Sequence, residues 1–517
     1  MSGPPLTSSP HDRELLAHVH PPDWVAPEPA PRYHLVVVGA GTAGLVTAAG
    51  AAGLGARVAL VERHLMGGDC LNVGCVPSKA LIASARAAAG IAASPALGIA
   101  VAAPPTVDFP AVMERMRRLR AGLAGHDGAR RFTDLGVDVF LGAAAFVASD
   151  AVAVGGLTLR FARAVVATGG RAFVPPIPGL AEAGCRTNET IFDLTERPER
   201  LVVVGGGPIG CELAQAFARL GSRVTIVQRH AQLLPREDRE AAGLLLRTFA
   251  AEGIDVRLAA SLERVERRGG QKVLHLLRDG ACETIEADEI LVAAGRRPNV
   301  EGLGLEAAGI AFTARGVTVD DHLRTTNPRV FAAGDVALDH QFTHLADAAA
   351  RIVVQNALFP FKRRASRLTL PWCTYTDPEI AHVGLARAEA EARGLTVEEV
   401  AVPFAEVDRA RLTGETAGFA RILVEARKGR ILGATVAGAQ AGELISEVSV
   451  AMAGGVTLGA LAGVIHPYPT LAEVLRKAGD AWNRRRLTPL TRRLLAGWLN
   501  VRFGRCGELA RRRGGTG

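Results

Sequence analysis

The chain has 517 residues, of which 48% are hydrophobic and 58 are glycines, so we expect about three globular domains and exclude a disordered chain. Its net charge of +8 invites a nucleic-acid-binding interpretation. Only 5% of the residues are aromatic, however, which leaves little material for base stacking, and we expect no nucleic-acid partner.

The seven cysteines are an odd number for a long chain, and the first residues lack the basic and apolar regions of a secretory signal. We therefore expect a cytoplasmic protein. In that reducing compartment a closely spaced cysteine pair is catalytic rather than structural. Residues 1–32 are rich in proline and serine. This composition predicts an extended N-terminal arm or linker, with room for a short helix over residues 14–19.

A dinucleotide-binding unit is predicted directly after this arm. Residues 35–38 (LVVV) are typical of a buried parallel strand and run into GAGTAG, a glycine-rich turn. The three glycines of its fingerprint are Gly39, Gly41 and Gly44. A second strand over residues 58–61 ends in Glu62, which suits an adenosine ribose. This pattern explains the uncharged residues 35–56 better than a membrane span of that length does.

Residues 67–79 (GGDCLNVGCVPSK) place Cys70 and Cys75 five residues apart, with Lys79 one helical turn beyond the second cysteine. A proline two residues after Cys75 suits a first helical turn, so Cys75 is expected at a helix N-terminus, where a thiol pKa is lowered. Lys79 lies on the same helix face and adds positive charge. Buried structural thiols or a zinc site are the alternatives, but no second cysteine pair accompanies them. We predict a redox-active disulfide.

A second fingerprint follows about 165 residues after the first. Residues 201–204 (LVVV) lead into GGGPIG, and its three glycines are Gly205, Gly207 and Gly210. The next strand, residues 224–227, ends in Gln228 and Arg229 instead of an acid. Without the acid a 2′-phosphate meets no repulsion, and Arg229 can pair with it, which favours NADPH over NADH. Arginine is abundant in this chain, so chance placement of Arg229 is the alternative.

Further cofactor contacts are predicted where buried strands end in glycine turns and next to the first cysteine. The strand-and-turn segments are VVATGG (residues 165–170), ILVAAGRRP (residues 290–298) and RVFAAGDV (residues 329–336). Glycine allows a close backbone approach, and an acid at a strand end can accept a hydrogen bond from a cofactor hydroxyl. The predicted contacts are Gly68, Asp69, Thr168, Gly169, Gly295, Gly334 and Asp335.

From about residue 368 the pattern changes to that of a separate α+β domain. Alternating residues 419–424 and 431–436 predict antiparallel strands, and a helical period covers residues 442–454. The domain ends in IHPYPTLAE, residues 466–473 with the preceding isoleucine. Beyond it, residues 482–517 form a basic amphipathic tail. We expect a helix packed on the body of the protein, with contact to an anionic membrane surface as the alternative.

Together these motifs resemble the FAD-dependent pyridine nucleotide–disulfide oxidoreductases, and within them the mercuric reductase-like branch. The resemblance implies an α/β protein with two Rossmann-like three-layer domains, for FAD and NAD(P), and a C-terminal α+β dimerisation domain. It implies a homodimer in which the partner's C-terminal domain completes each active site. The expected boundaries are 1–32 for the arm, 33–170 and 295–367 for the FAD domain, 171–294 for the NAD(P) domain, 368–481 for the dimerisation domain and 482–517 for the tail.

The resemblance also implies roles for individual residues. Cys75 would lie beneath the flavin as the charge-transfer thiolate, and Cys70 would be the interchange thiol that meets the substrate. Lys79 would lie beside the flavin, paired with Glu212. The first fingerprint with Glu62 would hold the ADP half of FAD, Thr168 and Gly169 would lie along it, and Asp335 would bind its ribityl chain. The second fingerprint with Arg229 would hold NADPH.

The C-terminal motif departs from that of disulfide reductases in this family. Those enzymes carry a histidine five residues before a glutamate, whereas here Tyr468 stands five residues before Glu473 and His466 is in another register. Tyrosine is a poor general base at neutral pH, which fits an acceptor that needs no thiol protonation, such as Hg(II) held between thiolates. The tail carries only Cys506 where mercuric reductases carry a cysteine pair, and residues 1–32 have no CxxC motif. Reduction of a small disulfide or lipoamide, and a low-turnover sensor or membrane-docked scaffold, are the alternatives.

Overall fold

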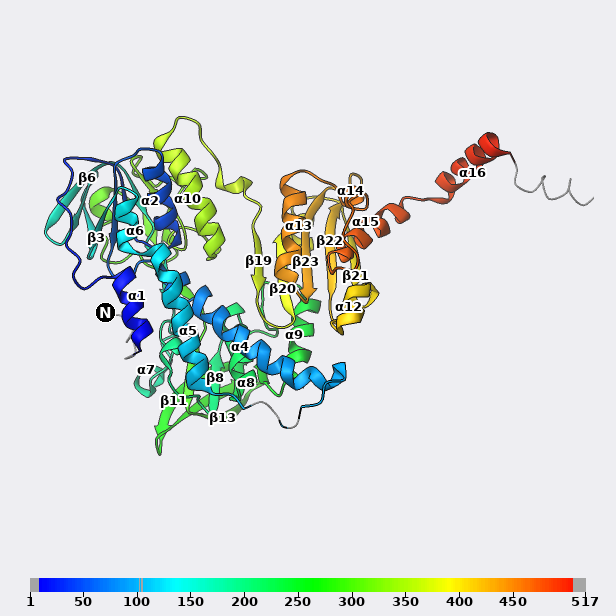
Figure 1. Cartoon of the computed structure of the whole chain (residues 1–517), viewed down its shortest axis with the longest axis horizontal. Coiled ribbons are helices and arrows are strands. Elements are labelled where there is room, and N and C mark those ends of the chain that lie inside the picture. The colour runs from blue at the N-terminus through cyan, green and yellow to red at the C-terminus, as the bar shows by residue number, and fades with distance from the viewer. Residues whose placement is uncertain (1–8, 102, 104–105, 505–517) are drawn as a thin grey trace, which may run out of the picture. The chain divides into compact units, whose positions relative to one another are not determined.

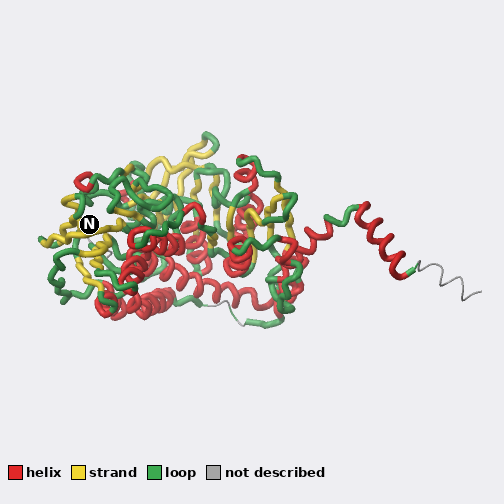
Figure 2. The backbone as a smooth tube through the Cα atoms, turned by 90° about the horizontal axis from the view of Figure 1, so that it is seen from above, coloured by secondary structure: helices red, strands yellow, loops and turns green. Residues whose placement is uncertain are grey.

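The computed structural model describes residues 9–101, 103 and 106–504. Its contacts divide the chain into two compact units, Met1–Leu368 and Thr369–Gly517. Figure 1 labels the elements of both units, and Figure 2 distinguishes their helices from their strands by colour. The α/β class expected from the sequence is confirmed, with parallel sheets in the first unit and an antiparallel sheet in the second.

The first unit contains a sheet whose strands lie in the order β3-β2-β1-β6-β5-β4, with β18 paired to β6. Its parallel members are β1 (Tyr33–Val38), β2 (Val58–Glu62), β3 (Val137–Leu141), β6 (Leu157–Val166) and β18 (Val330–Ala332). Strands β4 (Ala144–Ala148) and β5 (Ala151–Val154) extend it as an antiparallel meander. Strand β18 returns to this sheet from far along the chain, so the domain is discontinuous in sequence.

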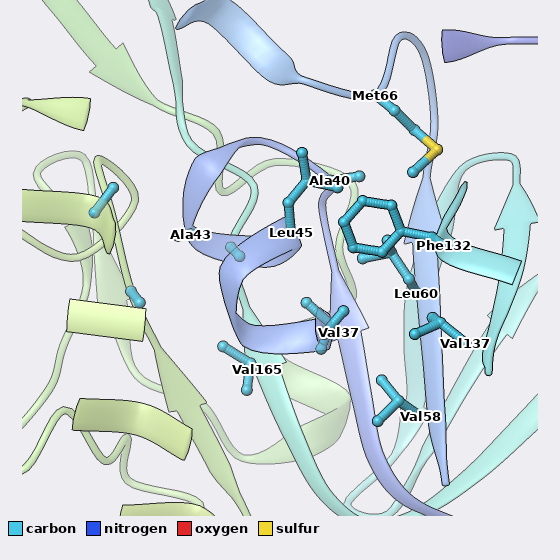
Figure 3. Close-up of a cluster of buried hydrophobic side chains, with 14 of the residues drawn as sticks. Val37, Ala40, Ala43, Leu45, Val58, Leu60, Met66, Phe132, Val137 and Val165 are labelled. Carbon is cyan, nitrogen blue, oxygen red and sulfur yellow. The ribbon is translucent and has the colours of Figure 1, made fainter. Parts of the chain in front are cut away.

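The LVVV run that opens the fingerprint is buried on both faces of this sheet. Leu35 and Val37 belong to one core cluster, and Val36 and Val38 belong to another, as the period of two in a strand requires. Figure 3 shows the first cluster, where Ala43 and Leu45 of helix α2 lie over strand residues such as Val37. Helix, parallel sheet and antiparallel strands therefore form three layers.

Helices α2 (Thr42–Gly53) and α10 (Thr343–Leu358) lie side by side over the first sheet (Figure 1). The other helices of this unit before residue 180 are α1 (Pro10–Val19), α3 (Gly68–Asn72), α4 (Cys75–Ala93), α5 (Phe109–Ala124) and α6 (Ala129–Asp134). Asp108 caps α5 by accepting a hydrogen bond from the Ala111 amide at 3.0 Å, which satisfies one of the amides that a helix start leaves unpaired.

A second parallel sheet, in the order β10-β9-β8-β14, contains the second fingerprint. Its strands are β8 (Arg200–Val204), β9 (Arg223–Gln228), β10 (Asp255–Leu258) and β14 (Glu289–Val292), with helices α7 (Leu180–Ala183), α8 (Pro208–Arg219) and α9 (Arg239–Ala251). An antiparallel sheet of β11 (Ala260–Arg268), β12 (Gln271–Arg278) and β13 (Ala281–Ala287) packs into the same core. Two strand pairs complete the unit: β7 (Gly170–Ala172) with β15 (Arg296–Pro298), and β16 (Phe312–Thr313) with β17 (Gly316–Val317).

The N-terminal arm contains the short helix expected over residues 14–19, but this helix, α1, begins earlier, at Pro10, and packs on the domain. Helix α1 buries Leu15 and Val19 in the core of the first sheet. Its Asp12 is 2% exposed and accepts a hydrogen bond from Arg120 of α5 at 2.7 Å. Proline and serine content misled the prediction because Ser9 and Pro10 serve as the N-cap and first residue of the helix rather than as linker residues. Residues 1–8 lie outside the described residues.

The second unit is built on an antiparallel sheet in the order β19-β20-β23-β22-β21. These strands are β19 (Pro371–Thr374), β20 (Glu379–Gly384), β21 (Val397–Pro403), β22 (Phe419–Glu425) and β23 (Ile431–Gly438). The helices are α11 (Arg387–Ala392), α12 (Asp408–Thr413), α13 (Ala441–Ala453), α14 (Leu458–Leu461), α15 (Glu473–Arg485) and α16 (Pro489–Phe503). Leu444, Ile445 and Val448 of α13 belong to the core of this unit, which confirms the helical period predicted there.

The tail differs from the prediction in two ways. Helix α15 runs through Arg485, and Trp482 is 2% exposed within the core, so the first turn of the predicted tail belongs to the α+β domain. Helix α16 follows it and buries none of its residues, so the expected packing of this helix on the body of the protein is wrong. Residues 505–517, including Cys506, lie outside the described residues.

One helical stretch of the described residues, Gly68–Leu97, is long and apolar enough to cross a bilayer. It carries the cysteine pair, and its helix α4 packs against α5 and α8. Length and composition alone do not make such a stretch a membrane span. The uncharged residues 35–56 fold instead as strand β1 and helix α2 with the turns that follow them.

Candidate active site

The two cysteines of residues 67–79 lie in adjoining helices. Cys70 belongs to α3, and Cys75 is the first residue of α4. Gly74 permits this junction, because a Cβ there would lie 2.7 Å from the carbonyl oxygen of Asp69. Both cysteines are free thiols in the structure, and each is the largest influence on the pKa of the other. The pair is therefore close enough to exchange a proton.

The pKa values of the two thiols move in opposite directions. The hydrogen bond from Cys70, with help from Thr343 and the positive charge of Lys79, lowers the pKa of Cys75 to about 6 despite burial. The same hydrogen bond, reinforced by burial, raises the pKa of Cys70. Cys75 is consequently the thiolate at neutral pH, and Cys70 is the thiol that donates to it.

Lys79 and Glu212 are brought together from distant parts of the chain. Lys79 Nζ donates to Glu212 Oε2 at 2.7 Å, linking α4 to α8. Glu212 is 6% exposed, so its carboxylate is almost removed from water and the pair is tight. The lysine thus has a fixed position one helical turn from Cys75.

Thr343 is a site residue that the sequence analysis missed. It is the first residue of α10, and its Oγ1 lies 3.4 Å from Cys75 Sγ. Interaction with its hydroxyl lowers the pKa of Cys75 and opposes the rise in the pKa of Cys70. Thr343 and Cys75 are 268 positions apart, so no local sequence pattern indicates this contact and only the fold reveals it.

The first fingerprint forms a turn that only glycine can build. Gly39 has φ +103°, and a Cβ on Gly44 would lie 1.8 Å from the Gly39 carbonyl oxygen. A Cβ on Gly68 would lie 2.7 Å from the Cα of Gly41, so the redox segment and the turn approach through bare backbone. Gly41 caps α2 without a side-chain hydrogen bond, which leaves the helix amides open to a pyrophosphate. The residues therefore fit the phosphates of a dinucleotide.

Glu62 ends β2 beside this turn. Its carboxylate accepts hydrogen bonds from the backbone amides of Ala40 at 2.7 Å and His64 at 2.8 Å. Burial raises the pKa of Glu62, and these amides oppose that rise. The acid is thus fixed at the mouth of the turn, where a ribose would lie.

Two predicted acids meet on one arginine. Arg296, at the start of β15, is paired with Asp69 of α3 and lies 3.5 Å from Asp335, directly after Gly334. Burial raises the pKa of Asp335 to about 6, against the charge of Arg296. The sequence analysis named both acids and Gly295 but missed Arg296, which the GRRP segment contains. Two acids predicted to lie near one cofactor require a positive charge between them, and this requirement could have indicated Arg296 from the sequence.

Thr168 and Gly169 lie where β6 ends. The Thr168 hydroxyl donates to the Asn299 carbonyl oxygen at 2.7 Å, and Gly169 has φ +64°. A Cβ on Gly39 would lie 3.0 Å from the Thr168 Cα, so the backbone that follows β6 lies against the first fingerprint. The structure therefore brings both residues, together with Gly39, to one edge of the first sheet.

The second fingerprint repeats the first. Gly205 has φ +115°, and a Cβ on Gly210 would lie 2.0 Å from the Gly205 carbonyl oxygen. Gly207 caps α8 without a side-chain hydrogen bond. Gln228 is buried at the end of β9, and Arg229 after it is exposed, with Nε 3.4 Å from His230 Nε2. Arg229 is therefore free to approach a ligand on this turn.

The C-terminal motif lies in the second unit. Both ring nitrogens of His466 face acceptors, the Val464 carbonyl oxygen at 3.0 Å and Glu447 Oε1 at 2.8 Å. His466 therefore contacts Val464 and Glu447 rather than Tyr468 or Glu473. Tyr468 is 73% exposed and donates to Asp408 at 3.2 Å, which raises the pKa of its phenol.

Glu473 is 6% exposed and accepts a hydrogen bond from Arg476 through Oε1. Its Oε2 is buried and has no hydrogen-bond partner among the described residues. The structure thus does not join Tyr468 to Glu473, and the carboxylate oxygen that would orient a histidine at position 468 is unpaired.

Residues 33–352 match the model of the family described as pyridine nucleotide-disulphide oxidoreductase, and residues 370–479 match its dimerisation domain, which supports a homodimer. Among curated proteins, the chain is 36% identical to a mercuric reductase of Streptomyces lividans, over 87% of this chain and 96% of that protein. It is 35% identical to a dihydrolipoyl dehydrogenase of Bacillus subtilis, over 86% of this chain and 95% of the relative.

Solved structures show the same relationship. The HOCl-induced flavoprotein disulfide reductase RclA from Escherichia coli is 31% identical, with a TM-score of 0.77, over 86% of this chain and 99% of that chain. A Cu(II) complex of the same reductase matches equally well, with a TM-score of 0.77. LpdA from Mycobacterium tuberculosis is 28% identical, with a TM-score of 0.79, over 89% of this chain and all of that chain.

Proposed function

The chain belongs to the pyridine nucleotide-disulphide oxidoreductase family, and from this we propose that it reduces a thiol-bound metal ion such as Hg(II) at Cys70 and Cys75. Members of this family are FAD-dependent oxidoreductases with NAD(P)H as the electron donor, and this assignment holds for the chain. FAD, when bound, supplies the two-electron step between NAD(P)H and the cysteine pair. The acceptor and the residue roles are our proposal.

The opposite pKa shifts of the two cysteines are the observation that carries the proposal. Cys75, with its pKa lowered to about 6, is held as a thiolate by Cys70, Thr343 and Lys79 and would be the sulfur next to the flavin when FAD is bound. Cys70 keeps its proton until an acceptor arrives and is the sulfur that meets it. Two adjacent soft sulfur ligands suit a soft metal ion. In the balanced reaction, Hg(II) and NADPH give Hg(0), NADP⁺ and one proton.

The C-terminal motif favours a metal over a disulfide acceptor. A disulfide substrate leaves as a thiolate that must be protonated, whereas metal reduction at two thiolates requires no such acid. His466 is bound to Val464 and Glu447, in another register, and the raised pKa of Tyr468 makes its phenol a poor source of that proton near neutral pH. Relatives named mercuric reductase, and the Cu(II) complex of the similar reductase, support a metal acceptor.

Reduction of a small disulfide or lipoamide is the second candidate, because relatives of similar identity are named dihydrolipoyl dehydrogenase. Glu473 is the acid that such chemistry would use, and Tyr468 stands where those enzymes carry the histidine. A low-turnover sensor is the remaining alternative. We further propose NADPH as the preferred donor, on the exposed Arg229, and the cytoplasm as the compartment, because a cycling dithiol needs reducing surroundings.

Steady-state NADPH oxidation by the FAD-loaded enzyme tests the acceptor, with a thiol complex of Hg(II), glutathione disulfide, lipoamide and a quinone as the panel. We expect turnover with Hg(II), and a loss of more than roughly a hundredfold in Cys70→Ser and Cys75→Ser. Quinone reduction serves as the control, because it does not require the cysteine pair. Tyr468→His should gain lipoamide turnover by giving Glu473 a histidine to orient. If wild type turns over with disulfides alone, the metal acceptor is ruled out. If none of the acceptors supports turnover, the sensor is favoured.

A further inference from the structure

Helix α16, Pro489–Phe503, lies beyond the segment that matches the dimerisation domain, which ends at residue 479. None of its residues is buried. Its large apolar side chains are between 47% and 87% exposed: Leu490, Leu494, Leu495, Trp498, Leu499, Val501 and Phe503. Such a concentration of exposed leucine and aromatic surface is costly in water and marks a contact site.

The charge around this helix has one sign. Between Asp480 and Glu508 the sequence contains no acidic residue. The arginines of this interval that the structure describes are Arg484, Arg485, Arg486, Arg492, Arg493 and Arg502. A surface with this charge is complementary to an anionic partner and repels a second copy of itself.

Part of the apolar surface of α16 forms a stripe along one face, with Arg492 and Arg493 outside that stripe. Leu490, Leu494, Trp498 and Val501 recur at helical spacing and share one face. The Arg502 guanidinium lies 5.2 Å from the Trp498 ring centroid, so its cation stacks on an aromatic ring. Arginine and tryptophan in contact match the boundary between lipid headgroups and acyl chains, where one part of each side chain is apolar and the other is wet.

We propose that α16 and the arginines before it bind the surface of an anionic lipid bilayer. The apolar face enters the headgroup boundary, and the arginines pair with lipid phosphates, so α16 docks the protein on the surface of the bilayer. A nucleic acid is a poorer match, because Trp498 and Phe503 are two stacking platforms among five exposed aliphatic side chains. The docked enzyme would act on acceptors that arrive through, or partition into, the bilayer.

Vesicle co-sedimentation of the full-length, FAD-loaded protein tests this proposal. The probe vesicles are phosphatidylcholine alone, and two parts phosphatidylcholine with one part phosphatidylglycerol. We expect at least about hundredfold tighter binding to the anionic vesicles, weakened by salt. Each arginine near an anionic leaflet strengthens binding by about fivefold, so R492Q/R493Q/R502Q should lose roughly a hundredfold. L494Q/W498Q should lose binding to both vesicles.

The matched control is R130Q/R160Q/R315Q, which removes the same charge from exposed arginines of the first unit. It should bind vesicles as wild type does, and all variants should keep quinone reduction in solution. Absence of wild-type binding, equal loss in the control, or unchanged binding of L494Q/W498Q would overturn the proposal. If L494Q/W498Q instead dissociates the dimer, α16 contacts a second copy and the membrane assignment is wrong.

Discussion

The two glycine turns of the first unit have nearly the same backbone but different chemistry at the strand that follows. Gly39 and Gly205 have φ of +103° and +115°, and a Cβ on Gly44 or Gly210 would approach the preceding carbonyl oxygen to 1.8 or 2.0 Å. The first turn faces the carboxylate of Glu62, whereas the second is followed by Gln228 and an exposed arginine.

The shape of a dinucleotide site and the choice of dinucleotide are thus specified by different residues. Glycine fixes the shape of a dinucleotide site, and one or two residues at the next strand end select the dinucleotide. The helices after the turns differ as well. Helix α2 carries no charged residue, whereas α8 carries Glu212, which reaches Lys79 at the cysteine pair. The helix after the second turn therefore contributes to the electrostatics of the redox site.

The largest expected effect comes from filling either turn. In Gly44→Ala the new Cβ collides with backbone, so the first turn cannot close and FAD should be lost, with more than roughly a hundredfold less activity on every acceptor. Gly210→Ala should keep its flavin spectrum and lose reduction by NAD(P)H, while dithionite still reduces it. Flavin content and the two reduction assays check this contrast, which fails if both variants lose flavin equally.

Helix α1 of the N-terminal arm is connected through Arg120 to α3, which lies against the first turn. Asp12 and Arg120 are 2% and 3% exposed, and Arg120 also donates to the Asn72 carbonyl oxygen at the end of α3. Asp12→Asn should lower the free energy of unfolding by about 3 kcal/mol, because it leaves a buried arginine without its counter-charge. Asp23→Asn is the control, since its partner Arg130 and Asp23 itself are both 73% exposed. Equal denaturation midpoints for the two variants would contradict the bracing role.

The link from α8 to the cysteines predicts a pH dependence. Cys75 reacts as a thiolate above its pKa of about 6, so its alkylation rate should rise with pH through that value and then level off. Lys79→Met removes the cation that lowers this pKa and should shift the midpoint upward by about one unit. Glu212→Gln should shift it slightly downward, because the carboxylate raises the pKa of Cys75. Peptide-resolved alkylation with iodoacetamide measures both shifts, and an unchanged midpoint in Lys79→Met would remove the lysine from the account.

The smallest effect is expected at the strand end that selects the donor. Arg229→Glu should reduce kcat/KM for NADPH by about tenfold and leave the value for NADH within about twofold, because one charge-assisted contact to the 2′-phosphate is lost. His230→Gln, next to it, is the control and should leave the preference unchanged. A parallel loss for both donors would show that Arg229 supports the turn rather than reading the phosphate.

Features that depend on neighbouring residues were predictable from the sequence. The LVVV strands, both glycine turns and the helix start at Cys75 follow from local composition and spacing, and the structure confirms these elements. Features that depend on contacts across the fold were not. Thr343 meets Cys75 from 268 positions away, and Arg296 joins two acids that lie far apart in the chain.

The predictions for the two terminal segments were incomplete for a different reason. The proline-rich composition of the N-terminus concealed where the capped helix α1 begins, and the amphipathic pattern of α16 gave no information about which surface would cover it. Composition describes what a segment can do alone, whereas the buried Asp12 and the uncovered Trp498 depend on whether a complementary surface exists.

Thiol labelling of the FAD-loaded enzyme before and after anaerobic NADPH tests the central claim most directly. The account predicts that air-oxidised enzyme protects Cys70 and Cys75 from alkylation, and that NADPH exposes two new thiols per flavin, both mapped to these residues by peptide mass spectrometry. Labelling of the pair that is the same before and after NADPH would contradict the claim that electrons leave the flavin through these two sulfurs.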